Sequence, residues 1–194
     1  QGMPANGYTE LVENVLKVPG ITVHLNTRFD PNAKGDYDHV FYSGPIDAWF
    51  GHTEGRLPYR TLDFEVFRDT GDYQGNAVIN VCDNSQRYTR VTEHKHFAPW
   101  EAHESSVTYH EYSRLCGPDD VPYYPIRLVK EKDQLRRYVD MVAAIGNVTF
   151  LGRLGTYRYL DMDVTIHEAL GAAADLLGAW NSGAAPAPFS VDPL

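Results

Sequence analysis

The sequence has few cysteines and no long hydrophobic run. Its 194 residues include only two cysteines, Cys82 and Cys116, which form neither a metal-type pair nor a disulfide framework. Such sparse cysteine fits a reducing compartment, so we expect a cytoplasmic protein. No apolar run approaches the roughly 20 residues that a membrane helix needs, and no signal peptide is visible. With 43% hydrophobic residues, the chain is predicted to be soluble and globular, without a membrane partner.

Positive charge is also scarce, because 17 lysines and arginines face 26 acidic residues and give a net charge of -9. A nucleic-acid backbone demands a basic surface, so we expect no nucleic-acid partner. Any anionic ligand must be held by local arginines against the field of the whole protein.

Common catalytic motifs are missing as well. The chain contains no GxSxG, CxxC pair, HExxH or Walker sequence, which weakens the hydrolase, zinc-enzyme and NTPase interpretations. It opens with Gln1-Gly2-Met3, and a helical pattern begins almost at once with no strand before it. We therefore expect a fragment of a longer protein.

The hydrophobic periodicity predicts an α/β fold with an inserted antiparallel β-sheet. Helices are expected at residues 7–18, 131–144 and 163–180, and strands at 21–29, 39–44 and 147–152. Four runs rich in β-branched and aromatic residues lie between positions 59 and 111 and predict the sheet. The predicted domains are 1–57 and 130–182, which together form one α/β domain, 58–129, which forms the sheet, and 183–194, which forms a flexible tail.

The stretch GRLGTYRYLDMD, Gly152 to Asp163, is the most unusual part of the chain. It follows an apolar strand pattern and precedes a helix whose N-cap is expected at Asp161. A helix N-terminus offers free amides for a phosphate or for sugar hydroxyls, and Gly152 and Gly155 would permit close approach of a ligand. The alternative is a structural loop that Asp161 caps.

A second polar cluster lies in YTRVTEHKHF. If the whole stretch is a strand, then Tyr88, Arg90, Thr92, His94 and His96 share one face. Burying such a face costs free energy unless an anion or an acidic side chain lies beside it, so the pattern indicates an anion-binding face. The alternative is a face that is simply exposed to solvent. His94 and His96 could also ligate a metal, but Arg90 and Lys95 would repel a cation, so we expect none.

Single polar residues on the neighbouring runs complete this surface. Arg60, Asn80, Arg90 and Glu111 could line one polar face of the sheet, although each alone is more often surface decoration. Tyr123-Tyr124, between two prolines, forms a rigid aromatic corner that serves either packing or phosphate binding.

Six phrases of the chain resemble the UDP-galactopyranose mutase family in order and spacing, from about Gly2 to Leu177. They are VFYSGPIDAWFG, GRLPYRTLDFE, QGNAVINVCD, YTRVTEHKHF, PYYPI and GRLGTYRYLDMD. The resemblance implies the C-terminal part of an FAD-binding, Rossmann-like flavoprotein. It implies an isomerase that interconverts UDP-galactopyranose and UDP-galactofuranose through an adduct between the sugar and N5 of reduced FAD. UDP-galactose would be the substrate, a homodimer is expected, and the missing N-terminal half would be a partner.

The same resemblance implies roles for individual residues. Arg90 and Asp161 are the expected catalytic residues. The substrate would be bound by Arg60, Asn80, Arg90, Glu111, Tyr124 and Tyr159. FAD would be bound by Arg153, Tyr159, Leu160, Asp161 and Met162.

The chain also departs from the family pattern. The opening Rossmann strand with GxGxxG and the helical region with a mobile substrate loop are absent, so the chain alone is expected to bind FAD weakly or not at all and to be inactive. Two alternatives stay open: a non-catalytic module that binds nucleotide sugars, and a flavin oxidoreductase of related fold.

Overall fold

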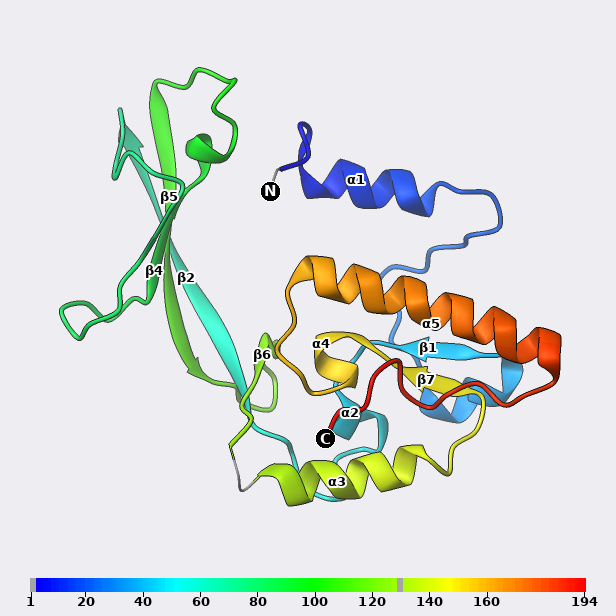
Figure 1. Cartoon of the computed structure of the whole chain (residues 1–194). Coiled ribbons are helices and arrows are strands. Elements are labelled where there is room, and N and C mark those ends of the chain that lie inside the picture. Colours follow the sequence, from blue (N-terminus) through cyan, green and yellow to red (C-terminus); the bar gives the residue numbers. More distant parts are fainter. Residues whose placement is uncertain (1–2, 129–130) are drawn as a thin grey trace. The chain divides into compact units, whose positions relative to one another are not determined.

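The chain folds into two units, and the computed structural model describes residues 3–128 and 131–194 (Figure 1). Unit 1 comprises Gln1–Arg28 and Leu62–Arg114, and unit 2 comprises Phe29–Thr61 and Leu115–Leu194. The structure thus shows a mixed α/β chain interrupted by an antiparallel sheet. The N-terminal residues group with the sheet, whereas the sequence suggests that they belong with the α/β part. The expectation that the chain is a fragment of a longer protein depends partly on Gln1 and Gly2, and these two residues lie outside the described residues.

Unit 2 is built on two parallel strands, β1 (Val40–Tyr42) and β7 (Val148–Phe150). Val40 lies opposite Val148, and Tyr42 lies opposite Phe150. Both strands were predicted. The 3-10 helix η1 (Pro31–Asp36) precedes β1, and the helices of the unit are α2 (Ile46–Trp49), α3 (Glu131–Val142), α4 (Gly152–Gly155) and α5 (Met162–Ser182).

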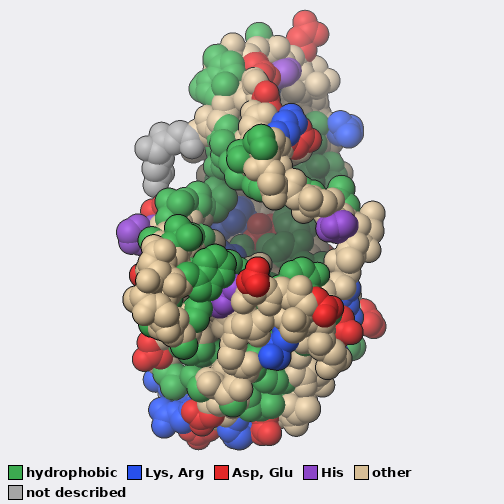
Figure 2. Space-filling model, turned by 90° about the vertical axis from the view of Figure 1, so that its right-hand side faces the viewer, with side chains coloured by type: hydrophobic (Ala, Val, Ile, Leu, Met, Phe, Trp, Pro, Cys, Tyr) green, Lys and Arg blue, Asp and Glu red, His purple; other side chains and the backbone are tan. Residues whose placement is uncertain are grey.

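Helix α5 begins where the sequence predicts, with Asp161 as the N-cap, and ends at Gly183 in the left-handed conformation. It buries Ala172 and Leu176, whereas Leu170 and Leu177 remain exposed. Figure 2 looks at the molecule from the side on which α5 ends and shows hydrophobic side chains on that surface.

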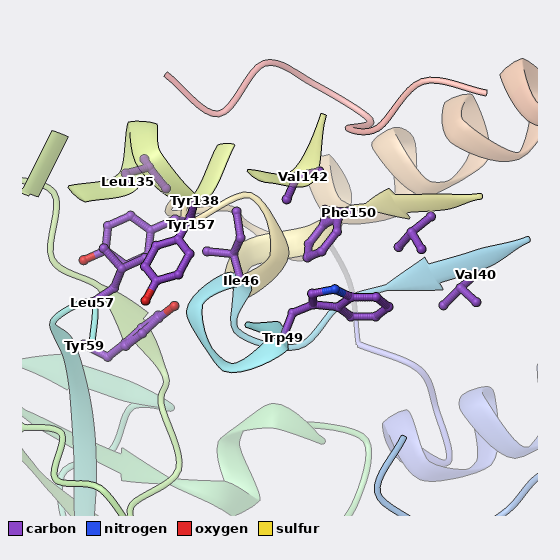
Figure 3. Close-up of a cluster of buried hydrophobic side chains, with 11 residues drawn as sticks. Val40, Ile46, Trp49, Leu57, Tyr59, Leu135, Tyr138, Val142, Phe150 and Tyr157 are labelled. Atoms are coloured by element: carbon purple, nitrogen blue, oxygen red, sulfur yellow. The ribbon is translucent and has the colours of Figure 1, made fainter. Parts of the chain in front are cut away.

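The core of unit 2 is aromatic (Figure 3). The ring of Trp49 meets the rings of Tyr42 and Phe150 edge-on, at centroid distances of 4.8 and 5.3 Å. Such edge-to-face pairs contribute beyond the area that they bury. The core cluster consists of Val40, Ile46, Trp49, Leu57, Tyr59, Leu135, Tyr138, Val142, Val148, Phe150 and Tyr157.

The C-terminal segment packs in the structure, although its composition predicts a flexible tail. The backbone N–H of Phe150 donates to Pro188 at 2.9 Å, and Phe150 accepts from the N–H of Ser190 at 3.1 Å. Pro193 is buried. The packing follows from the free edge of β7, because its backbone groups need partners that the segment provides.

The antiparallel sheet has the strand order β3-β4-β5-β2-β6. Its strands are β2 (Tyr59–Thr70), β3 (Val78–Asn80), β4 (Arg90–Glu93), β5 (Ser105–Leu115) and β6 (Tyr124–Pro125). Four of them match the four predicted runs. The β2–β6 pair belongs to unit 2, with Tyr59 opposite Pro125 and Arg60 opposite Tyr124.

Two expectations for unit 1 need correction. Residues 21–29 form no strand, and Ile21, Val23 and Leu25 are exposed, so apolar composition without a partner strand was misleading. Strand β4 ends at Glu93, and His94–Phe97 forms the 3-10 helix η2. Helix α1 (Gly7–Leu16) forms as predicted but buries none of its residues.

Among the described residues, no helix is long and apolar enough to cross a membrane.

Candidate functional site

A row of three polar side chains crosses strands β3, β4 and β5 in unit 1. The strand register places Asn80 opposite Arg90 and Arg90 opposite Glu111. Arg90 Nε donates to Asn80 Oδ1 at 2.9 Å, and Arg90 Nη1 lies 3.6 Å from Glu111 Oε2. The structure therefore brings these three predicted site residues together, and we call them the arginine row.

The arginine row is suited to bind an anion. A guanidinium carries five N–H donors, so Arg90 retains donors beyond its contacts with Asn80 and Glu111. Its side chain is 40% exposed, while that of Glu111 is 14% exposed. Asn80 on β3 and Glu111 on β5 thus hold the guanidinium between the two strands that flank β4, and part of it stays accessible.

The opposite face of β4 anchors a loop through a buried carboxylate. Glu93 is fully buried and accepts hydrogen bonds from the backbone N–H groups of Tyr73, Gln74 and Gly75 and from the Ser106 hydroxyl. Burial would raise the pKa of Glu93, but these four hydrogen bonds outweigh it and lower the pKa to about 2. Glu93 is therefore ionised at neutral pH and fixes the strand that carries Arg90.

The two histidines of HKHF do not form the side-by-side pair that a strand would give. His94 packs edge-on against Tyr109 at 4.7 Å. His96 Nε2 lies 3.4 Å from Glu93 Oε2 and 3.6 Å from Asp72 Oδ1.

The carboxylates around His96 form a group with metal-like spacing. Asp72, Glu93 and His96 place one ligand atom each within 4.8 Å of the others. However, Lys95 Nζ lies 2.6 Å from Asp72 Oδ1 and supplies a positive charge there. Glu93 already accepts four hydrogen bonds, so we interpret this group as an ion-pair network that fastens the loop to η2.

A second cluster lies in unit 2, where Arg153 stacks on two tyrosines. Its guanidinium carbon lies 4.9 Å from the ring centroid of Tyr124 and 5.0 Å from that of Tyr159. The two tyrosine rings stack at 5.6 Å with an interplanar angle of 21°. Cation–π contacts of this geometry stabilise each ring position. We call Tyr124, Arg153 and Tyr159 the tyrosine stack.

Arg153 is held by backbone carbonyls as well as by rings. Its Nε donates to Leu160 O at 3.2 Å and its Nη1 donates to Tyr123 O at 3.2 Å, while Nη2 also donates to Leu160 O. Arg153 therefore positions β6 and the loop before α5, a role that the sequence did not predict.

The loop that carries Tyr159 has two further anchors. Tyr157 adopts a positive φ of 50° and is buried. Its hydroxyl oxygen lies 2.6 Å from Pro58 O and 2.8 Å from Ile126 O, so the two carbonyls share its single hydrogen. At Gly155, a Cβ atom would lie 2.7 Å from the carbonyl oxygen of Tyr42, so only glycine fits without a shift. These contacts anchor the loop that carries Tyr159, a residue that is 64% exposed.

The N-terminus of α5 is accessible to a ligand. Asp161 caps the helix in an extended conformation, but its carboxylate makes no capping hydrogen bond and is exposed. Met162 is exposed, whereas Leu160 is buried and its carbonyl is occupied by Arg153. Arg158 Nη1 pairs with Glu168 Oε1 at 2.8 Å just behind this end.

The predicted site residues thus form two groups, each within one unit. Arg60 belongs with the second group, since it lies opposite Tyr124 and its carbonyl accepts from the N–H of Tyr123 at 2.9 Å. The sequence missed Glu93 and the anchoring role of Tyr157. The alternation of β4 indicated that Glu93 faces away from Arg90, but nothing in the sequence indicated the backbone conformation of Tyr157.

Comparison with known proteins identifies related chains. The family described as UDP-galactopyranose mutase matches residues 1–159. A probable UDP-galactopyranose mutase of Klebsiella pneumoniae is 55% identical over 177 residues, which cover 91% of this chain and 46% of that protein. The dTDP-fucopyranose mutase of Escherichia coli is 47% identical over 180 residues, covering 89% of this chain and 48% of that protein. A UDP-galactopyranose mutase of Mycoplasma pneumoniae is 31% identical, with 91% and 48% coverage.

Among solved structures, that of a reduced UDP-galactopyranose mutase superimposes with a TM-score of 0.57 at 13% identity. The superposition covers 73% of this chain and 41% of that structure and shows a shared fold. The chain spans about half the length of the curated relatives that it matches.

Proposed function

Because the chain belongs to the UDP-galactopyranose mutase family, we propose that it supplies the C-terminal part of a flavin-dependent isomerase. The reaction would interconvert the pyranose and furanose forms of a hexose that is linked to a nucleoside diphosphate. The arginine row carries this proposal, because it presents a fixed and partly exposed guanidinium in an acidic protein.

The identity of the sugar nucleotide is the finer part of the proposal. One relative is named for UDP-galactopyranose and another for dTDP-fucopyranose, and both are close to this chain. Both substrates contain a pyrophosphate, which is the group that Arg90 would contact. We favour UDP-galactose, since the greater of these two identities is with the Klebsiella protein.

Arg90 would act on the nucleotide when it leaves and returns. Breaking the bond between the sugar and the phosphate increases the negative charge on the pyrophosphate, so a fixed cation helps most at that moment. Asn80 and Glu111 hold the guanidinium before the substrate arrives, which avoids the cost of ordering it during the reaction.

The tyrosine stack would contribute neutral donors. The phenol groups of Tyr124 and Tyr159 can donate hydrogen bonds to phosphate oxygens, and Arg153 fixes the planes of both rings. Arg60, opposite Tyr124, would support the same phosphate-binding role.

The residues at the start of α5 fit a flat cofactor. Tyr159 and Met162 have exposed apolar side chains that can contact an isoalloxazine ring. The exposed carboxylate of Asp161 can accept hydrogen bonds from N–H groups of that ring. Leu160 and Arg153 would hold this segment in place, since the guanidinium is already bonded to the carbonyl of Leu160. Reduced FAD, when bound, supplies the nucleophile for the anomeric carbon, and there is no net oxidation of the sugar.

A second candidate is a module that binds nucleotide sugars without catalysis. It is favoured by the fact that the arginine row is complete within unit 1 and requires no cofactor-binding segment.

The test is a conversion assay on the complete enzyme, reconstituted with reduced FAD and supplied with UDP-galactofuranose or the dTDP-linked furanose. Formation of UDP-galactopyranose from UDP-galactofuranose supports the proposal with UDP-galactose as the substrate. Conversion of the dTDP-linked furanose alone would support the isomerase and change its sugar nucleotide. UDP binding without any conversion would favour the binding module, and reduction of oxidised flavin by the substrate would favour an oxidoreductase.

A further inference from the structure

One buried carboxylate of unit 2 has no part in the proposed chemistry. Asp47, in the short helix α2, is 1% exposed. Its Oδ2 accepts from the backbone N–H of Leu57 at 2.9 Å and lies 3.0 Å from His52 Nδ1, while its Oδ1 accepts from the Tyr59 hydroxyl at 3.2 Å. A buried polar group is costly unless it is hydrogen-bonded, and these contacts satisfy both oxygens. Asp47 therefore holds the loop that follows α2 to the first residue of β2.

The hydroxyl of Tyr59 is a lasting donor to Asp47. Burial, and then the neighbouring Asp47 carboxylate, raise the pKa of Tyr59 above its ordinary value of 10.0, so the phenol keeps its hydrogen. Tyr59 is itself buried, and its ring meets that of Tyr157 edge-on at a centroid distance of 5.2 Å and an angle of 86° (Figure 3). The contact with Asp47 thus sets the direction of a ring that packs at the start of β2.

Strand β6 connects Tyr59 to the first tyrosine of the tyrosine stack. Tyr59 lies opposite Pro125, and the neighbouring residue of β6 is Tyr124. Just beyond β6, the backbone N–H of Ile126 donates to Pro58 O at 3.0 Å. The position of β6, and with it that of the Tyr124 ring, therefore depends on where the first residue of β2 lies.

The loop before α5 connects Tyr59 to the second tyrosine of the stack. Tyr157, whose ring contacts Tyr59, places its hydroxyl between Pro58 O and Ile126 O. Two residues further along the chain, the same loop carries Tyr159. One buried ring, held by one carboxylate, is thus in contact with both segments that supply the stack.

We infer that Asp47, acting through Tyr59, is a positioning residue for the tyrosine stack. This inference rests on the proposed function, in which the two phenols of the stack donate to a pyrophosphate. Without the Asp47 contact, the start of β2 can shift together with β6 and the loop before α5, and the two phenols lose the common alignment that one anion needs. The competing explanation is that Asp47 serves stability alone.

The test compares Asp47→Asn and Tyr59→Phe in the complete enzyme by calorimetric titration with UDP. Each variant should bind UDP about 2- to 10-fold more weakly, as expected when one hydrogen bond to the ligand is impaired. Tyr59→Phe removes only the hydroxyl from the pair and keeps the buried ring, so it serves if Asp47→Asn does not fold. Tyr124→Phe, measured alongside, removes a phenol of the stack directly and shows whether the stack binds UDP.

His52→Gly is the matched control, because it removes the other side chain that contacts Asp47 and leaves Tyr59 in place. His52 adopts a positive φ of 60°, a conformation that glycine accepts without strain. This variant should lower Tm but keep the UDP affinity of the parent. A role in stability alone would instead make UDP affinity follow Tm in all three variants, or leave it unchanged in all three.

Hydrogen exchange of segment 123–128 gives a second readout that needs no ligand. The segment contains the Ile126 N–H that donates to Pro58 O, and its exchange should be about tenfold faster in Asp47→Asn and Tyr59→Phe and unchanged in His52→Gly. Parent exchange rates in both variants would overturn the inference. So would parent UDP affinity in both variants when Tyr124→Phe binds UDP more weakly, or an equal loss of affinity in His52→Gly. If Tyr124→Phe binds UDP like the parent, the proposed role of the stack fails, and the exchange rates still decide whether Asp47 positions it.

Discussion

Arg90 and Asn80 lie directly opposite each other on adjacent antiparallel strands, and Arg90 Nε donates to Asn80 Oδ1 at 2.9 Å. Strand register alone sets this contact, because opposite side chains of an antiparallel pair share one face. The guanidinium is therefore fixed by the sheet itself, independently of any ligand.

Tyr159→Phe tests the phenol separately from the ring. The variant keeps the stack on Arg153 and Tyr124 but loses one donor, so we expect UDP affinity to fall about 2- to 10-fold, from 0.5–1.5 kcal/mol per hydrogen bond. Calorimetric titration measures this. Tyr123→Phe is the matched control, and equal losses in the two variants would contradict the assignment to Tyr159.

Tyr157→Phe should destabilise the chain. It would leave the carbonyls of Pro58 and Ile126 without the hydroxyl that binds both, at a cost of about 1–3 kcal/mol. Thermal denaturation should show a fall in Tm of roughly 2–4 °C per kcal/mol. Tyr37→Phe, at an exposed ring, is the control, and an unchanged Tm for Tyr157→Phe would refute the anchoring role.

Glycine substitutions should have opposite effects at two positions. Gly155→Ala should destabilise, because its Cβ would meet the carbonyl oxygen of Tyr42 at 2.7 Å. Gly178→Ala, in α5 with nothing within 4 Å, should stabilise by about 0.5–1 kcal/mol, as alanine does in an open helix position. Chemical denaturation of both variants gives the sign of each change, and a stabilised Gly155→Ala would contradict the close approach.

Glu93 should make stability depend on acid pH. Its folded-state pKa of about 2 lies below the ordinary value of 4.5, so its contribution is complete above pH 4.5 and is lost as the pH falls from about 4.5 to 2. We expect the free energy of unfolding to fall across this range. Glu93→Gln should be less stable at pH 7 and should flatten this part of the profile.

Glu104→Gln, at an exposed carboxylate of the same unit, is the matched control for Glu93 and should keep the parent profile. A Glu93→Gln variant with the parent's pH dependence would show that another group titrates there.

The sequence predicted most strands and helices because their periodicity is local. It also predicted that Asn80, Arg90 and Glu111 share a face, since alternation along a strand decides which side each residue takes. It failed at His94 and His96, where Glu93 ends the strand by binding a loop 18 to 20 residues away. That contact depends on tertiary structure, which the alternation of HKHF does not reveal.

The C-terminal segment shows the same limit. Its alanines, prolines and glycine predict an unpacked end, yet Phe189 lies against Phe150 and the segment pairs with β7. Only the position of the free strand edge explains this, and composition contains no information about that edge. The contacts of Arg153 with Tyr124, Tyr159 and backbone carbonyls were likewise not predicted, and its expected contact with FAD stays a prediction.

The most direct measurement is a calorimetric titration of UDP into the complete enzyme, comparing Arg90→Ala with Arg68→Ala, a control at an exposed arginine of the same unit. Loss of a charge-assisted contact worth about 1.5–3 kcal/mol predicts a 10- to 100-fold weaker Kd for Arg90→Ala and an unchanged Kd for the control. If Arg90→Ala binds UDP as tightly as the parent protein does, the arginine row is not the pyrophosphate site.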